Sequence, residues 1–551
     1  MSNLEIALLL DEIGDLVELA GDEGFKTRAY RRAARLIQGL DEPVGRLVDE
    51  GRLRALPGIG QALEAKITEL VRTGTCRYLE DLRQQIPPGL RQVMAVSGVG
   101  PRTAILLHRE LGVADLEGLE AAARAGRLRE LPRLGPRREE AILDGVARVR
   151  ARGGLIPLAV ARPLALGVAR VLGEDPAVAR VEAVGGVRRW CEVVERVVLL
   201  ATGPDPGRVG EVFRALGAPR TVELEVVDER EFPLALVRLT GSDGHWRRLQ
   251  ERARGLGLDL DGRGLCRGGQ RVEIAGEDDL YRQLGLPAVP PELREDDGEV
   301  EAALAGTLPR LVEAGDIRGD LHAHTDWSDG QASLERMAAV ARDRGYGYLA
   351  VTDHSRSLAM ARGLDENRLR QQVEAIAVLN RELAPFRLLT GIEVDILADG
   401  SLDLPDSVLA ELDVVVASVH SRFRLDRQAM TARFLRAMEN PRVDCIGHLT
   451  GRLIGERDPY ELDLDAVLEA CARTGTWLEI NASPHRLDVG GQLAREARER
   501  GVGLALGTDA HAPVCLEDMA WGVATARRAW LRPEDIVNSR PWQDLVDRRG
   551  R

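Results

Sequence analysis

The segment HAHTDWSDG, residues 322–330, carries His322, His324 and Asp329. Seven of the nine histidines of the 551-residue chain lie after residue 320. Further histidines and carboxylates follow this segment at the ends of short apolar runs: His354, Glu393, His420, His448, Asp509 and His511. Imidazole nitrogens and carboxylate oxygens spread in this way are typical of a site that holds several metal ions.

The region around these residues alternates short apolar segments with helical stretches. The apolar segments are YLAVTD, RLLTGIEVD, DVVVASVH, CIGHL, WLEINA and GLALGTDAH, within residues 348–511. This alternation predicts a parallel β/α barrel over residues 319–551. Since active sites of such barrels lie at the carboxyl ends of the strands, we expect the metal ligands to meet at one face.

Residues 1–150 are expected to form short helices separated by Gly-Pro turns. LPGIGQALEAKI (56–67) and VSGVGPRTAILL (96–107) repeat one pattern, in which a Gly-hydrophobic-Gly turn opens an amphipathic helix. The glycines, Gly58, Gly60, Gly98 and Gly100, let the backbone amides approach an anion closely. Both turns resemble helix-hairpin-helix motifs, which hold the DNA backbone without reading its sequence. The repeat favours DNA binding over plain helix packing.

Composition excludes several classes of protein. The chain has no apolar run long enough to cross a membrane, and its acidic start is not a secretory signal. Its six cysteines form no CxxC pair, as expected in a reducing compartment. A net charge of −13 argues against a partner bound by bulk electrostatics alone. These features predict a cytoplasmic protein with no membrane partner.

Lysine is almost absent from the chain. Of 75 basic residues only Lys26 and Lys66 are lysines, so arginine has replaced lysine wherever a guanidinium serves. This bias indicates that the two remaining amines are needed for their chemistry. Chance survival on a helix surface is the alternative.

The middle of the chain alternates apolar and helical stretches. Residues 178–184, 196–202, 221–227 and 234–240 are predicted strands of an α/β or α+β domain. A stretch rich in proline and acidic residues, within 286–318, is predicted to be a linker that leads into a helix.

Residues 1–285 resemble the body of the bacterial family X DNA polymerases, and the remainder resembles the PHP (polymerase and histidinol phosphatase) domain that follows in that family. Five segments carry the resemblance: FKTRAYRRAARLI (25–37), LPGIG (56–60), GGVRR (185–189), TGS (240–242) and EDDLYRQLGLPAVPPELRE (277–295). The resemblance implies a multidomain fold. Its first two domains are an N-terminal helical domain (1–85) and a fingers-like domain (86–153), each with a helix-hairpin-helix motif. They are followed by an α+β polymerase-β-like palm and thumb (154–285), the linker (286–318) and a distorted (β/α)7 PHP barrel (319–551).

The resemblance gives both lysines a role. Lys26 aligns with the residue that holds a 5′-phosphate in the family. Lys66 aligns with an amine that forms a Schiff base with an abasic sugar in eukaryotic relatives, chemistry that arginine cannot perform. A lysine that merely contacts phosphate is the alternative at Lys66.

The palm departs from the family pattern. Three carboxylates, two of them in a D-x-D motif, hold two magnesium ions in active family X polymerases. Arg196 and Val198 occupy the D-x-D positions here, and the third position is Glu223. Asp243 replaces the lysine expected where an incoming triphosphate would be met. These changes predict that the palm does not polymerise and serves as a scaffold.

The PHP pattern, in contrast, is complete. By resemblance the nine residues that opened this section bind three divalent ions, with Glu393 bridging, and the donor types are compatible with manganese, zinc or iron. Such ions acidify water for attack on phosphorus. Arg356, Arg422 and Arg452 lie close in sequence to ligands and are predicted to hold phosphate. Asp353 is expected to orient the ring of His354.

The function predicted from these features is a metal-dependent DNA phosphodiesterase, a 3′–5′ exonuclease used in DNA repair. Its expected partners are gapped DNA or single-stranded ends, and we expect a monomer. Three alternatives remain open: an active gap-filling polymerase and exonuclease, a small-molecule phosphomonoesterase of the histidinol-phosphatase type, and a non-catalytic factor that binds DNA ends.

Overall fold

A computed structural model describes residues 3–547 except for 21–24, 39, 41–42, 57, 88, 95, 97–98, 133, 152–154 and 220. The chain folds as two compact units, one made of Met1–Gly153 with Gly455–Arg457 and the other of Gly154–Ile454 with Asp458–Arg551. Among the described residues, none of the helices combines the length and the apolar character needed to cross a membrane.

The first unit is helical. Its α-helices are α1 (Asn3–Leu19), α2 (Phe25–Gln38), α3 (Val44–Asp49), α4 (Gln61–Thr73), α5 (Arg77–Gln85), α6 (Leu90–Met94), α7 (Pro101–Leu111), α8 (Leu116–Arg124) and α9 (Pro136–Ala151). Helices α1–α5 enclose most of one hydrophobic core and α6–α9 most of another. Gly60 and Gly100 are the N-caps of α4 and α7, so each described glycine turn opens a helix as the repeat predicts.

The palm region of the second unit contains a three-stranded sheet. Its elements are β1 (Ile156–Pro157), α10 (Leu158–Gly173), β2 (Arg180–Ala183), α11 (Gly185–Arg188), β3 (Val193–Val194), β4 (Val197–Thr202), α12 (Pro206–Ala215) and β5 (Val222–Val226). The sheet order is β2-β4-β5, with β2 antiparallel and β5 parallel to β4. Three of the four strands predicted in this region are therefore present.

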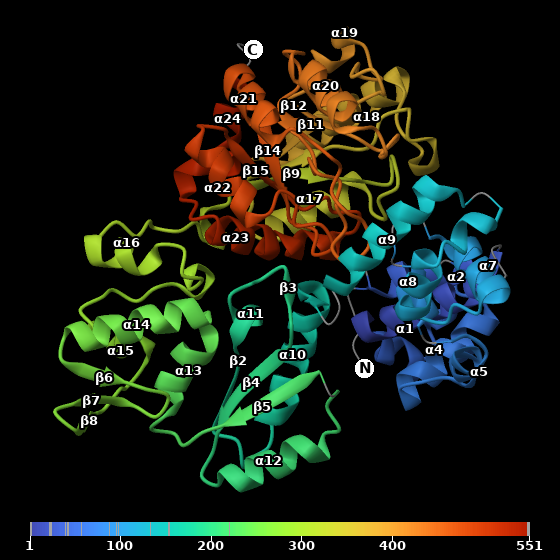
Figure 1. Ribbon diagram of the computed structural model, residues 1–551. Coiled ribbons are helices and arrows are strands. Elements are labelled where there is room, and N and C mark those ends of the chain that lie inside the picture. The colour runs from blue at the N-terminus through green and yellow to red at the C-terminus, as the bar shows by residue number, and fades with distance from the viewer. Residues whose placement is uncertain are drawn as a thin grey trace. The chain divides into compact units, whose positions relative to one another are not determined.

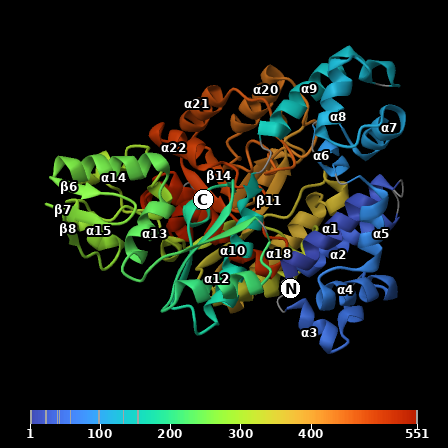
Figure 2. The same cartoon turned by 60° about the horizontal axis from the view of Figure 1, so that its bottom comes forward.

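The fourth predicted strand, residues 234–240, is wrong. It is part of helix α13 (Phe232–Thr240), in which seven of the nine residues are buried. A short apolar run of this kind suits a buried helix as well as a buried strand. Beyond it lie α14 (Asp243–Gly255), the small antiparallel sheet of β6 (Leu258–Leu260), β7 (Leu265–Arg267) and β8 (Gln270–Val272), then α15 (Glu277–Gln283) and α16 (Glu299–Ala305). Figure 2 shows this small sheet beside α14 and α15.

The rest of the chain is a seven-stranded parallel sheet in the order β15-β14-β13-β12-β11-β10-β9, surrounded by helices (Figure 1). The strands are β9 (Gly319–Ala323), β10 (Tyr348–Val351), β11 (Arg387–Asp395), β12 (Val414–Ser418), β13 (Cys445–Ile446), β14 (Trp477–Asn481) and β15 (Leu504–Gly507). The helices are α17 (Leu334–Asp343), α18 (Glu366–Leu383), α19 (Asp406–Leu409), α20 (Arg427–Met438), α21 (Leu464–Thr474), α22 (Gly491–Glu499), α23 (Met519–Arg528) and α24 (Trp542–Asp547).

The two ends of this sheet meet. The backbone nitrogen of His324, just after β9, donates to the carbonyl of Ala510, just after β15, at 2.8 Å. Asp509 N donates in turn to His322 O at 2.8 Å. The sheet is thus a nearly closed barrel, which confirms the predicted (β/α)7 fold, and its closure brings the first and last ligand motifs together.

Candidate metal centre

His322 and His324 share one face of the chain at the end of β9, because side chains two residues apart in an extended strand point the same way. Buried Asp320 fixes this end of the strand by accepting hydrogen bonds from His322 N and Thr508 N, both at 3.1 Å. The two imidazoles therefore enter the barrel mouth from a rigid position.

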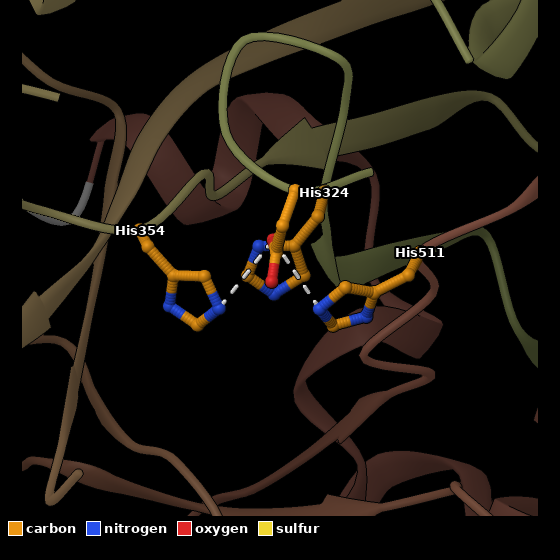
Figure 3. A group of neighbouring side chains, drawn as sticks. His324, His354 and His511 are labelled. Atoms are coloured by element: carbon orange, nitrogen blue, oxygen red, sulfur yellow. Dashed lines mark ion pairs between the residues drawn. The ribbon is translucent and has the colours of Figure 1, made fainter. Parts of the chain in front are cut away.

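The first group of ligand atoms joins three separate segments. His324, Asp329, His354 and His511 bring one donor atom each to within 4.8 Å of one another. Asp329 Oδ1 lies 3.7 Å from His354 Nε2 and 3.5 Å from His511 Nε2. Figure 3 shows the rings of His354 and His511 on either side of His324.

Two further groups adjoin the first. His322, His324 and Asp509 form one, and His354, Glu393 and His420 form the other. Glu393 lies at the middle of the centre, within 4 Å of five imidazoles: His322, His324, His354, His420 and His448. All nine predicted ligands thus converge, and His354 and His324 are each shared between two groups.

The carboxylates of the centre are held in the ionised form. Burial favours the neutral form of Glu393, but the charges of His420, His354 and His322 outweigh it and hold the pKa of this carboxyl well below its usual value. The pKa of Asp509 is likewise well below its usual value, because His322 and His324 outweigh the effect of burial. Anionic oxygens are the ligands that divalent ions need.

The imidazoles divide into two kinds. Burial and the neighbouring His511 and His354 lower the pKa of His324 to about 3, so this ring is neutral. At His420, burial is outweighed by Glu393 and Asp395, which raise the pKa to about 10. At His511, Asp329 and Asp509 outweigh burial in the same way and raise the pKa to about 9. Burial of His322 is likewise outweighed by Glu479 and Glu393, which raise its pKa well above the usual value, so metal binding competes with protonation at these three imidazoles.

The donor set fits divalent metal ions. Several buried donor atoms lack a hydrogen-bond partner: His322 Nε2, His324 Nδ1, His354 Nδ1, His448 Nδ1 and Glu393 Oε2. With metal–ligand bonds of about 2.1 Å, two ligands of one ion lie roughly 3.3 Å apart. The separations of His420 Nε2 from Glu393 at 3.3 Å and of His322 Nε2 from Asp509 at 3.7 Å are of this order.

Two carboxylates that were not predicted from the sequence contact imidazole nitrogens or backbone atoms of the ligand histidines. Glu479 of β14 accepts from His322 Nδ1 at 2.6 Å and from His448 N at 2.7 Å. Asp395 lies 3.0 Å from His420 Nδ1. Carboxylates on the far nitrogen of a ligand histidine fix its tautomer and orientation. The sequence feature that could have pointed to both residues is an acidic residue inside an otherwise apolar predicted strand, as in WLEIN and GIEVD.

Asp353 does not have the expected role toward His354. Its carboxylate accepts from the backbone nitrogen and hydroxyl of Thr325, from Ser328 and from Gln372. It therefore fixes the loop that carries Asp329. Asp353 thus helps to position Asp329, and not its sequence neighbour His354.

The three arginines predicted to hold phosphate lie in different surroundings. Arg356 is 3.6 Å from Glu366, and Arg422 is exposed with a φ of 57°. Arg452 points to the palm, where its Nη2 lies 2.8 Å from Glu192 Oε1, and its Nε donates to Arg486 O at 2.9 Å. Its guanidinium is thus engaged by protein groups.

The positions that the sequence comparison with family X polymerases singled out in the palm hold an ion pair. Val198 of β4 faces Glu223 of β5 in the sheet register, and Arg196 Nη1 lies 3.2 Å from Glu223 Oε2. Both side chains are exposed, and the guanidinium of Arg196 lies against the carboxylate of Glu223. Asp243 is the first residue of α14.

The arginines of the GGVRR turn are also paired within the protein. Arg188 makes two contacts with Glu277, at 2.8 and 2.5 Å, and Arg189 Nε lies 3.0 Å from Glu295. Arg528 of α23 donates to Arg189 O at 2.9 Å. The turn is thus in contact with helix α23 of the PHP region.

The glycine turns of the helical unit have the expected local geometry where they are described. Gly58 has a φ of 91°, a value that favours glycine, and Gly98 lies outside the described residues. Lys26 is exposed on α2. Lys66 of α4 lies over the ring of Tyr78, with Nζ 4.7 Å from the ring centroid.

Comparison with known protein families gives four matches. Residues 1–76 match a helix-hairpin-helix domain, 90–148 a SAM-like helix-hairpin-helix tandem, 235–295 a DNA polymerase beta thumb and 320–483 a PHP domain. The helix-hairpin-helix and thumb matches imply DNA binding, and PHP domains are metal-dependent.

Curated relatives fall into two kinds. A protein named DNA polymerase/3′-5′ exonuclease PolX from Bacillus subtilis (strain 168) is 35% identical over 567 residues, with 99% of each chain covered. Probable phosphatases from Thermoanaerobacter sp. (strain X514) and Syntrophotalea carbinolica are 33% and 30% identical, over 40% of this chain and 89% and 90% of their own. The first kind matches the whole chain and the second only about 230 residues.

Proposed function

This chain belongs to the PolX family of DNA polymerases and 3′–5′ exonucleases. From that premise we propose that it is a metal-dependent DNA phosphodiesterase that acts as a 3′–5′ exonuclease in DNA repair. We further propose that its palm no longer polymerises. One observation carries the proposal. Nine nitrogen and oxygen ligands converge in the PHP barrel, while the palm has an arginine and a valine at two of its three metal positions.

The chemistry belongs to the barrel mouth. Three overlapping ligand groups support a site for three divalent ions, manganese, zinc or iron. When bound, such ions acidify water and offset the charge that develops on phosphorus and the leaving oxygen. The protein supplies ionised Glu393 and Asp509, which sit on rigid strand ends, and imidazoles whose far nitrogens are fixed by Glu479 and Asp395.

Loss of polymerisation rests on three independent features of the palm. The carboxylate of Glu223 is paired with Arg196, and the side chain of Val198, opposite it in the sheet, has no oxygen that could bind a metal ion. Both arginines of the GGVRR turn pair with Glu277 and Glu295. Magnesium requires near-octahedral oxygen coordination, which a single paired carboxylate does not supply.

The helical unit is proposed to hold the DNA backbone. Gly60 and Gly100 open α4 and α7 in the manner of backbone-binding turns, and we propose gapped DNA or single-stranded ends as the substrate of a monomeric enzyme. Lys26 is proposed to contact the 5′-phosphate, and Lys66 to contact phosphate or to form a Schiff base with an abasic sugar, which requires an amine.

Degradation of a gapped duplex tests the proposal. A primer strand labelled at its 5′ end is incubated with the purified protein and manganese, and products are resolved by length. We expect a ladder of labelled strands that shortens one nucleotide at a time from the 3′ end. An intact strand after many enzyme equivalents and long incubation would refute the exonuclease.

A phosphomonoesterase is the second candidate, because the barrel also matches proteins named probable phosphatases. The same preparation is given p-nitrophenyl phosphate beside the labelled duplex. Hydrolysis of the small ester far faster than of DNA would favour the phosphatase. We expect the opposite order, since a small phosphate ester makes no use of the helix-hairpin-helix turns.

A further inference from the structure

Arg486 lies beside the metal centre without a role in the ligand set. It sits in the loop between β14 and α22, and its Nε lies 3.7 Å from Asp509 Oδ2. Its Nη1 is buried and has no hydrogen-bond partner. A buried donor left unpaired is costly, so such a group in a native protein calls for an explanation.

The orientation of Asp509 shows which way this guanidinium faces. Asp509 Oδ1 is turned to His324 Nε2, at 3.1 Å, whereas Oδ2 faces Asn481 Nδ2, at 3.2 Å, and Arg486. The guanidinium therefore borders the centre on the side of Asp509 opposite the imidazoles. A positive group with an unused donor, next to a site that acts on phosphodiesters, complements a phosphoryl oxygen.

Three other arginines near the ligand segments donate to protein groups. Arg362 donates to Asp326 O and Ser328 O, and Arg368 donates to Trp327 O. Arg452 is held by Glu192 and by two backbone carbonyls. Among the described arginines that contact a ligand carboxylate, Arg486 is the one with a buried free donor.

The loop that carries Arg486 is held from the palm. Arg452 donates to the carbonyls of Arg486 and Leu487, and its Nη2 also lies 2.8 Å from Glu192 Oε1. Glu192 belongs to the palm and follows the GGVRR turn. At Gly490 an added Cβ would lie 2.4 Å from Glu192 Oε1 and 3.1 Å from Arg452 Nη2, so the chain closes tightly over the pair.

We propose that Arg486 binds a phosphate of the DNA substrate in the PHP centre, and that Glu192 of the palm is a positioning residue that acts on it through Arg452. The proposal rests on the function proposed above. It gives the palm a use other than polymerisation: its carboxylate fixes the arginine that holds the backbone of the strand being cut. Arg486 touches substrate, whereas Glu192 and Arg452 do not.

The test separates phosphate binding from catalysis. Inorganic phosphate binding to the manganese-loaded, full-length protein is measured by calorimetry for the wild type, Arg486→Gln, Arg486→Lys, Glu192→Ala and Glu195→Ala. Metal content, melting temperature and the KM and kcat for the labelled duplex are measured on the same samples. Glu195 is the matched control, because it is an exposed glutamate three residues from Glu192.

We expect Arg486→Gln to weaken phosphate binding and raise KM by about 10-fold to 100-fold, the range for one charge-assisted hydrogen bond, with metal content unchanged. Arg486→Lys should recover part of the loss, since an ammonium keeps the charge but not the fork geometry. Glu192→Ala should lower phosphate affinity several-fold without changing metal content, and Glu195→Ala should match the wild type.

The outcomes are distinguishable. Wild-type phosphate affinity in Arg486→Gln, or a loss of metal from this variant, would overturn the role of Arg486. If Arg486→Gln weakens phosphate binding but Glu192→Ala does not, the role assigned to the palm is overturned. If the wild type degrades no DNA but Arg486→Gln still loses phosphate affinity, the proposed exonuclease fails while the phosphate site stands.

Discussion

Alanine at His322 is expected to abolish DNA degradation, with a loss in kcat of at least about 1,000-fold, which corresponds to about 4 kcal/mol of transition-state stabilisation. His322 is almost fully buried, and its Nε2 lies 3.6 Å from Glu393 and 3.7 Å from Asp509, so it belongs to the middle of the ligand set. Removing it takes away one of the two imidazoles that lie between these carboxylates, the other being His324. Asp509→Ala should have an effect of similar size.

His485→Ala is the matched control. His485 lies in the same barrel, but its side chain is exposed and belongs to none of the three ligand groups. Degradation of the 5′-labelled duplex and bound metal are measured for each variant. Activity in His322→Ala and Asp509→Ala equal to that of His485→Ala would remove the PHP centre from the mechanism.

Glutamine at Glu479 is expected to lower metal affinity and degradation by about 10-fold to 100-fold, although this residue is not among the nine ligands. The Glu479 carboxylate joins His322 Nδ1 at 2.6 Å and the backbone nitrogen of His448 at 2.7 Å, so it orients two ligands at once. Glutamine keeps the size but loses the charge that makes His322 a stronger ligand. Higher manganese should restore much of the activity of Glu479→Gln and none of that of His322→Ala.

The exposed pair of Glu411 with Arg370 supplies the control, because Glu411→Gln removes a carboxylate at the barrel surface. Manganese titration followed by activity gives an apparent metal affinity for each variant. A Glu479→Gln protein with the same apparent affinity as Glu411→Gln would show that the hydrogen bond to His322 does not tune the centre.

Much of the barrel could be predicted from sequence, because its strands are short apolar runs and its ligands follow them. Residues 387–395 form strand β11 as predicted, and Glu393 lies in it beside the other ligand segments. Parallel strands deliver their carboxyl ends to one face, so the ligand motifs converge once the fold is known.

Other features could not be predicted because they depend on contacts between distant segments. Glu479 looks like any residue of a buried strand until His322, 157 residues away, is placed beside it. The guanidinium of Arg452 turns to Glu192, 260 residues away, and Arg486 comes next to Asp509 through a loop with no periodic pattern. Residues 234–240 were mistaken for a strand because a helix buried on all sides has no amphipathic period.

The central claim is that the PHP centre is the part of this enzyme that performs chemistry and that the palm does not. One gapped duplex, 5′-labelled on the primer strand, is incubated with the protein, all four dNTPs and either magnesium or manganese, and metal content is measured on the same sample. We predict that the labelled strand shortens from its 3′ end and never lengthens. Extension into the gap, retained in His322→Ala, would contradict the claim.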